Sequence, residues 1–149
     1  MTEKWLRVAY DELEAGVSEV PGPEHNPRIV AYHAVTRGGP SSDELPWCSS
    51  FASYCVERGG IRSAQSKRSR DWLPWGIGLR HPPHGAIVVL ERGRPPQPGP
   101  EILDAPGHVG FYVGPASESE ILVLGGNQRD RVDVTAFPRS RVLGFRWPN

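Results

Sequence analysis

The hydrophobic pattern of this chain changes near its middle, and this change limits the possible folds more than any other feature. In the first half, apolar residues such as Trp5, Ala9 and Leu13 recur four positions apart, which is the spacing of an amphipathic helix. In the second half, short β-branched and aromatic segments are separated by turn residues, which is typical of strands. Helices followed by consecutive strands predict an α+β fold, with the N-terminal helices packed on an antiparallel sheet of about five strands.

Caps and turn residues set the bounds of these elements. Asn26 and Pro27 are typical of a helix start, and the glycines before Pro40 are typical of a helix end. Residues 92–106 are rich in proline and glycine and predict an exposed loop. We expect helices at 3–16, 26–37 and 47–58, a short helix within 62–72, and strands at 86–91, 108–113, 121–124, 131–135 and 142–147.

Length and charge narrow the class of protein. The 149 residues suit a single domain, 1–149, and the 17 basic and 17 acidic residues give a formal net charge of zero. Nucleic-acid binding requires a cationic excess on one face, so nucleic acid is not an expected partner. The sequence contains neither the apolar core of a signal peptide nor an apolar run of membrane-spanning length. We therefore expect synthesis in the cytoplasm, no membrane span, and export, if any, by another route.

The two cysteines occupy different positions on one predicted helix. Cys48 opens the helix directly after Pro46 and Trp47, whereas Cys55 lies mid-helix among apolar residues. Seven helical residues separate them by roughly 10 Å, beyond disulfide reach, so both are expected to be thiols. The partial positive charge of a helix N-terminus lowers the pKa of a thiol. We therefore predict a partly exposed, nucleophilic Cys48 and a buried Cys55, with a buried apolar role as the alternative for Cys48.

A histidine and an amide complete a candidate catalytic set with Cys48. His108 opens an apolar strand between two glycines, where it can act as a general base; a core histidine bonded to a carbonyl is the alternative. Asn127 follows the next strand and can orient the imidazole, as the third member of a catalytic triad does. Gln128 is the second candidate for this role, and ordinary turn chemistry is the alternative for the segment.

Other polar and aromatic clusters carry less specific signals. His81 and His84 flank two prolines, but no cysteine or acidic partner has metal-ligand spacing, so no metal or other cofactor is expected. Trp47, Trp72 and Trp75 are candidate substrate-binding residues, because sugar-containing ligands stack on aromatic rings. Packing in the core explains these tryptophans equally well.

A family resemblance rests on motifs spread along nearly the whole chain, in the segments 19–23, 25–29, 46–49, 85–89, 107–112, 124–128 and 142–148. With these motifs the chain resembles the NlpC-like and CHAP-like papain-fold cysteine amidohydrolases that cut peptidoglycan. It is most similar to a small single-domain branch found in phage lysins and bacterial secreted lytic proteins. Relatives commonly have Asp where this chain has Ala86, and their third catalytic residue is often His or Glu.

The resemblance implies a papain-like fold with Cys48 as nucleophile, His108 as base and Asn127 as third residue. It implies hydrolysis of amide bonds in peptidoglycan stem peptides at the cell wall or periplasm, after release as a phage lysin or injection as an antibacterial toxin. Expected partners are peptidoglycan and, for an injected toxin, a delivery machine and an immunity protein. Two alternatives stay open: a non-catalytic wall-binding module of the same fold, and an acyltransferase or deamidase that uses Cys48 and His108. The sequence also leaves open which bond is cleaved, one within the peptide or the one between sugar and peptide.

Overall fold

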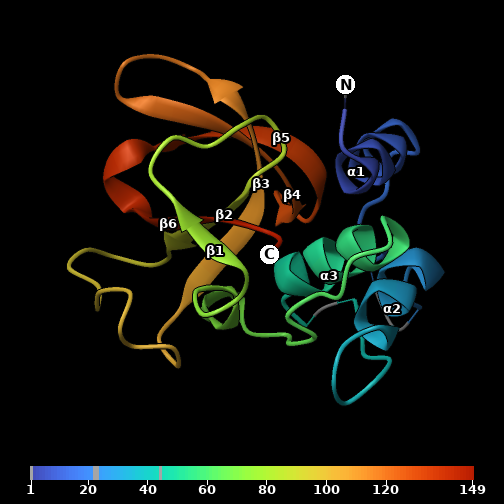
Figure 1. Cartoon of the computed structure of the whole chain (residues 1–149). Helices are drawn as coiled ribbons and strands as arrows, with labels where there is room; N and C mark the ends of the chain where they lie inside the picture. Colours follow the sequence, from blue (N-terminus) through green and yellow to red (C-terminus); the bar gives the residue numbers. More distant parts are fainter. Residues whose placement is uncertain (1, 22–23, 44) are drawn as a thin grey trace.

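A computed structural model describes residues 2–21, 24–43 and 45–149 of the chain. Gly22 and Pro23, which belong to one of the segments that carry the resemblance, lie outside the described residues. The fold is α+β, with helices packed on an antiparallel sheet, as the sequence predicts. The α-helices of the described part are α1 (Lys4–Glu14), α2 (Pro27–Ala34) and α3 (Cys48–Arg58), and Figure 1 shows them grouped on one side of the sheet.

The sheet of the described residues contains six strands in the order β1-β6-β2-β3-β4-β5. Five of them match the predicted segments, with β3, β4 and β5 extending further than expected. The additional strand, β1, is three residues long and pairs with the last strand of the chain. The strands are β1 (Ile77–Leu79), β2 (Ile87–Glu91), β3 (Gly107–Pro115), β4 (Glu120–Gln128), β5 (Arg131–Pro138) and β6 (Val142–Trp147).

The 3₁₀ helices differ from the predicted elements. Within 62–72, where a short helix was expected, only η1 (Ser69–Trp72) is helical, and η2 (Arg139–Arg141) precedes β6. Residues 92–106 contain no helix or strand, which confirms the predicted loop.

Alternation along the strands separates two apolar layers. In β2, Ile87 and Val89 belong to the main core between sheet and helices, whereas Val88 and Leu90 belong to a second cluster. Successive side chains of a strand point to opposite faces, so a continuously apolar strand can fill both layers. The helix α3 is the centre of the main core, because it contacts α1, α2, β3 and β4. Its residues are buried without interruption from Cys48 to Val56.

A buried carboxylate fixes α2 to α1. Glu12 is 2% exposed, and its Oε1 accepts hydrogen bonds from Arg28 Nε at 2.7 Å and from the Tyr32 hydroxyl at 2.6 Å. Burial raises the pKa of Glu12, but the bonds from Arg28 and Tyr32 outweigh it, and the pKa is lower than usual. The α2 helix also begins as predicted: the Asn26 side chain caps it by accepting the Arg28 N–H at 2.9 Å, and Pro27 is its first residue.

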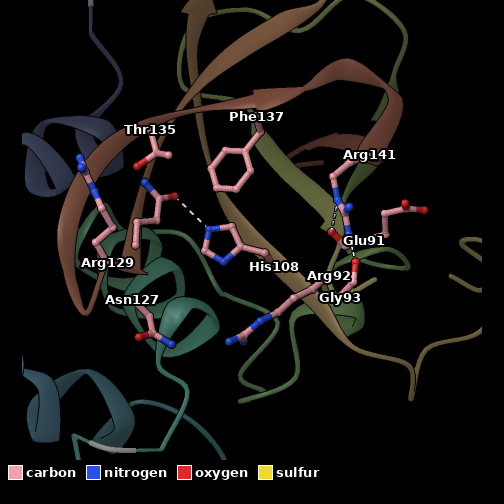
Figure 2. A pocket seen from close by; sticks show the side chains of 10 residues that line it. Glu91, Arg92, Gly93, His108, Asn127, Arg129, Thr135, Phe137 and Arg141 are labelled. Atoms are coloured by element: carbon pink, nitrogen blue, oxygen red, sulfur yellow. Dashed lines mark hydrogen bonds between the residues drawn. The ribbon is translucent and has the colours of Figure 1, made fainter. Parts of the chain in front are cut away.

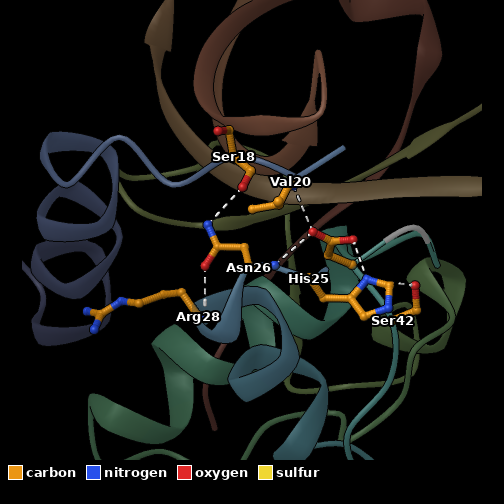
Figure 3. Close-up of polar contacts among 7 residues, drawn as sticks. Ser18, Val20, His25, Asn26, Arg28 and Ser42 are labelled. Carbon is orange, nitrogen blue, oxygen red and sulfur yellow. Dashed lines mark hydrogen bonds and ion pairs between the residues drawn. The ribbon is translucent and has the colours of Figure 1, made fainter. Parts of the chain in front are cut away.

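A second buried carboxylate holds the segment that leads to Cys48. Asp43 is fully buried, and its Oδ2 accepts the N–H groups of Val20 and Asn26, both at 2.9 Å. Its Oδ1 lies 2.9 Å from His25 Nδ1, and Figure 3 shows these contacts around His25. Burial raises the pKa of Asp43, but the hydrogen bonds and the His25 charge lower it below its usual value. The Asp43 carboxylate therefore joins the connection between α2 and α3 to the connection between α1 and α2, just ahead of α3.

No helix in the described part of the chain is long and apolar enough to cross a membrane.

Candidate active site

Cys48 is the first residue of α3, as the sequence predicts, but its exposure differs from the prediction. The side chain is only 2% exposed, because Ser69 of η1 lies against it with the Oγ atom 3.0 Å from Cys48 Sγ. The expected partial exposure was therefore wrong. The residue nevertheless lines a cavity of about 530 Å³ that Ser69 and the segment Asp104–Gly107 also line. Cys48 therefore lies where the main core, to which it belongs, borders this cavity.

The neighbours of Cys48 favour its ionised form. Burial raises the pKa of the thiol, but the charge of His108 and side-chain interactions with His108 and Ser69 lower it, together with a hydrogen bond from the Val109 backbone. The outcome is a pKa of about 6. The lowered pKa favours the thiolate, which is the nucleophilic form of cysteine.

His108 is held by a hydrogen bond whose direction the structure defines. The Gln128 amide nitrogen donates to the carbonyl oxygens of Val123 at 3.1 Å and Asp133 at 2.8 Å, so the amide oxygen is the atom that faces the imidazole. That oxygen lies 2.9 Å from His108 Nε2, which must therefore carry the proton. The other ring nitrogen, Nδ1, remains for the exchange of a proton with Cys48.

The electrostatic surroundings of His108 complement those of the thiol. Burial lowers the pKa of His108, but the Cys48 charge and the contacts with Cys48 and Gln128 raise it, and the net shift is upward. The imidazole ring also stacks on Phe137, with 5.3 Å between the ring centroids. Thiolate and imidazolium thus stabilise each other across the gap between α3 and β3.

The third position belongs to Gln128, which corrects the prediction of Asn127. Asn127 lines a cavity beside His108, but its side chain makes no hydrogen bond to the ring (Figure 2). The physical reason is an irregularity in the pairing of β4 with β5 between Gly125 and Gln128, where Asn127 adopts a left-handed backbone with φ of 56°. Such a bulge changes which residue of the strand points to a given face.

Gly125 provides the space for the pair of His108 and Gln128. A Cβ atom at this position would lie 2.4 Å from Gln128 Oε1 and 3.5 Å from His108 Nε2. The first distance is shorter than any real contact of a Cβ atom. A residue with a side chain at position 125 would therefore displace the amide from the ring.

The tryptophans do not form the predicted substrate-binding cleft. Trp47 and Trp72 are fully buried, and Trp72 Nε1 donates to Ser49 Oγ at 2.9 Å. Trp75 is partly exposed but lines a different cavity of about 350 Å³, next to the C-terminal residues. Burial of large aromatic rings contributes strongly to the core of a small domain. Packing in the core is the alternative that the sequence left open for Trp47 and Trp72.

Buried Arg70 forms part of the scaffold of the Cys48 cavity, a role that no local pattern indicates. Its Nε donates to the Pro106 carbonyl at 2.9 Å, and one terminal nitrogen donates to the carbonyls of Gly99 at 2.7 Å and Ile102 at 3.1 Å. Arg70 thereby holds the loop 92–106 against η1. Ser69 was missed for the same reason as Arg70: each acquires its role only from residues that are distant in sequence.

His108 opens onto a second cavity, of about 470 Å³, which borders that of Cys48. Arg92 and Gly93 line both cavities, so the two hollows meet at the end of β2. The two adjoining hollows leave room for an extended molecule that crosses the Cys48–His108 pair. Among the described residues, no three His, Cys, Asp or Glu side chains are grouped so that they could hold a metal ion.

A scan against protein-family models and a search of curated proteins found no match for this chain.

Proposed function

We propose that the chain is a papain-like cysteine hydrolase that cleaves amide bonds in peptidoglycan stem peptides, as a phage lysin or antibacterial effector. The observation that carries the hydrolase part is the set Cys48, His108 and Gln128, in which a thiol of lowered pKa faces an imidazole oriented by an amide. The peptidoglycan part rests on the resemblance of the sequence motifs to wall-cutting amidohydrolases.

The first half of the reaction starts from the Cys48 thiolate and the His108 imidazolium. The Cys48 thiolate attacks the carbonyl carbon of the scissile amide and forms a carbon–sulfur bond. The Cys48 backbone N–H, free at the first turn of α3, stabilises the oxyanion together with the partial positive charge of this 11-residue helix. His108 Nδ1 then gives its proton to the leaving nitrogen, the carbon–nitrogen bond breaks, and an amine departs.

The second half regenerates the enzyme. Neutral His108 takes a proton from water, and the hydroxide attacks the thioester carbon. The carbon–sulfur bond breaks, a carboxylic acid leaves, and the thiolate and imidazolium are restored. Gln128 accepts the same Nε2–H bond in both halves, so the ring keeps one orientation throughout.

The test of this function is digestion of purified peptidoglycan followed by mass analysis of the released muropeptides. The proposal expects one product with a new amine end and one with a new carboxylate end, whose masses together exceed that of the substrate by one water. Neither product should form with Cys48→Ala. Products in which a carboxamide has become a carboxylate, with loss of ammonia and gain of water, would identify a deamidase instead. Products that have gained an acyl group would identify an acyltransferase. Wall binding without products, equal in the wild type and Cys48→Ala, would identify a non-catalytic wall-binding module.

A further inference from the structure

Arg92 is a cationic side chain at the junction of the two active-site cavities. It directly follows β2, whose last residue, Glu91, pairs with Gly107 beside His108. It lines both the cavity of Cys48 and that of His108. In Figure 2 its side chain runs beneath the His108 ring toward Asn127. The Arg92 guanidinium therefore lies beside Cys48 and His108 but takes no part in the bond making and breaking itself.

The other cations that line the two cavities already have partners. Arg129 forms an ion pair with Asp133 at 2.6 Å, and Arg68 forms one with Asp71 at 2.9 Å. Arg141 donates to the carbonyl oxygens of Glu91 at 3.3 Å and Gly93 at 2.5 Å. Lys67 Nζ is bonded to Thr36 Oγ1 and to the carbonyl oxygens of Arg37 and Gly39.

Arg92, in contrast, makes no hydrogen bond or ion pair within the part of the chain that the structure describes. Its charge nevertheless reaches the base, because it acts to lower the pKa of His108. A free guanidinium offers five donors in a planar fork that matches a carboxylate. A substrate carboxylate at this place would both pair with Arg92 and remove its unfavourable effect on the His108 imidazolium.

We propose that Arg92 is a specificity-determining residue that binds a carboxylate of the substrate next to the scissile amide. The inference rests on the proposed function and narrows its substrate class. Stem peptides contain amino acids whose free carboxylates lie beside the peptide linkages and can also occur as carboxamides. Arg92 would favour the stem with the free acid, because a carboxamide presents neither the charge nor two equivalent acceptors.

The attraction of a carboxylate by Arg92 can be tested without peptidoglycan, by alkylating Cys48 with iodoacetate and with iodoacetamide. Both reagents form a carbon–sulfur bond with the thiolate and release iodide, but only iodoacetate carries a carboxylate. We expect Arg92→Gln to lower the ratio of the iodoacetate rate to the iodoacetamide rate by about 10-fold, the scale of one charge-assisted hydrogen bond. Arg92→Lys should lower it less, because it keeps the charge but loses the fork.

Arg94 supplies a matched control for this experiment. It has the same charge, lies two residues further along the same exposed loop, and lines neither cavity. Arg94→Gln should leave the ratio at the wild-type value. Equal ratios in the wild type and Arg92→Gln, or equal losses in Arg92→Gln and Arg94→Gln, would overturn the carboxylate site.

The substrate test compares muropeptides that differ only by a free or amidated carboxylate beside the bond that is cut. Wild-type protein should cut the free acid with a kcat/KM about 10-fold higher than the carboxamide, and Arg92→Gln should lose this preference, whereas Arg94→Gln should keep it. Equal wild-type rates on both forms would contradict the inference. If neither form is cut while the alkylation ratio behaves as expected, the proposed function fails and the anion site stands.

Discussion

Cys48 and Cys55 lie on the same helix and are both almost completely buried, yet their thiols have opposite acidities. Burial and the charge of Glu12 raise the pKa of Cys55 well above its usual value. Burial also raises that of Cys48, but His108, Ser69 and the Val109 backbone reverse the effect and bring it to about 6. The comparison shows that position on α3 matters because it decides which groups the thiol meets. Burial alone would make both cysteines inert.

The largest difference between the two cysteines should appear in turnover. Cys48→Ala removes the nucleophile and His108→Ala removes the base, so each should lower kcat on peptidoglycan by about 10⁴-fold or more, with little further loss in the double variant. Cys55→Ala should keep wild-type kcat and lose about 1 kcal/mol of unfolding free energy through lost packing. Muropeptide release and thermal unfolding measure the two effects. Equal losses of activity in Cys48→Ala and Cys55→Ala would contradict a catalytic role for Cys48 and a structural role for Cys55.

The orienting amide should have the next largest effect. Gln128→Ala leaves the imidazole in place but unheld, so we expect kcat to fall by about 100-fold. Asn127→Ala is the matched control, because Asn127 lines the same cavity without a bond to the ring, and it should change kcat little. Steady-state kinetics of both variants checks this assignment. A larger loss in Asn127→Ala than in Gln128→Ala would return the role to Asn127.

A smaller effect is expected at the hydroxyl next to Cys48. Ser69→Ala removes a hydrogen bond worth about 1 kcal/mol to the thiolate, so the pKa of Cys48 should rise and kcat/KM at pH 6 should fall about 3-fold. Ser53→Ala is the control, because Ser53 lies on α3 but its buried hydroxyl has no hydrogen-bond partner among the residues that the structure describes. It should leave the pH dependence unchanged. The pH profile of alkylation distinguishes the two variants.

The sequence predicted those parts of the site that depend on local pattern. A cysteine after a proline predicted the start of α3, and His108 at the head of an apolar run predicted the start of β3. The third residue depends instead on the irregular pairing of β4 with β5, which no local pattern around Gly125 reveals.

Long-range contacts explain the other differences from the sequence predictions. The strand β1 is only three residues long and exists because it pairs with β6, nearly seventy positions further along the chain. Likewise, the rings of Trp47 and Trp72 occupy the core, because their neighbours Gly126 and Ser49 are brought there by the fold. Distant partners of this kind leave no periodic signal in the sequence.

The most direct test of the central claim is the pH dependence of iodoacetamide labelling, followed at each cysteine by mass spectrometry of the folded protein. Cys48 ionises at the lower pH, so its labelling rate should rise with pH and reach half its maximum near pH 6. The His108→Ala variant should shift this midpoint upward, toward the value of an ordinary thiol. Cys55 should stay unlabelled over the same range. A Cys48 midpoint near pH 9 in the wild type, or labelling of Cys55 at the same rate, would contradict an activated thiolate at the start of α3.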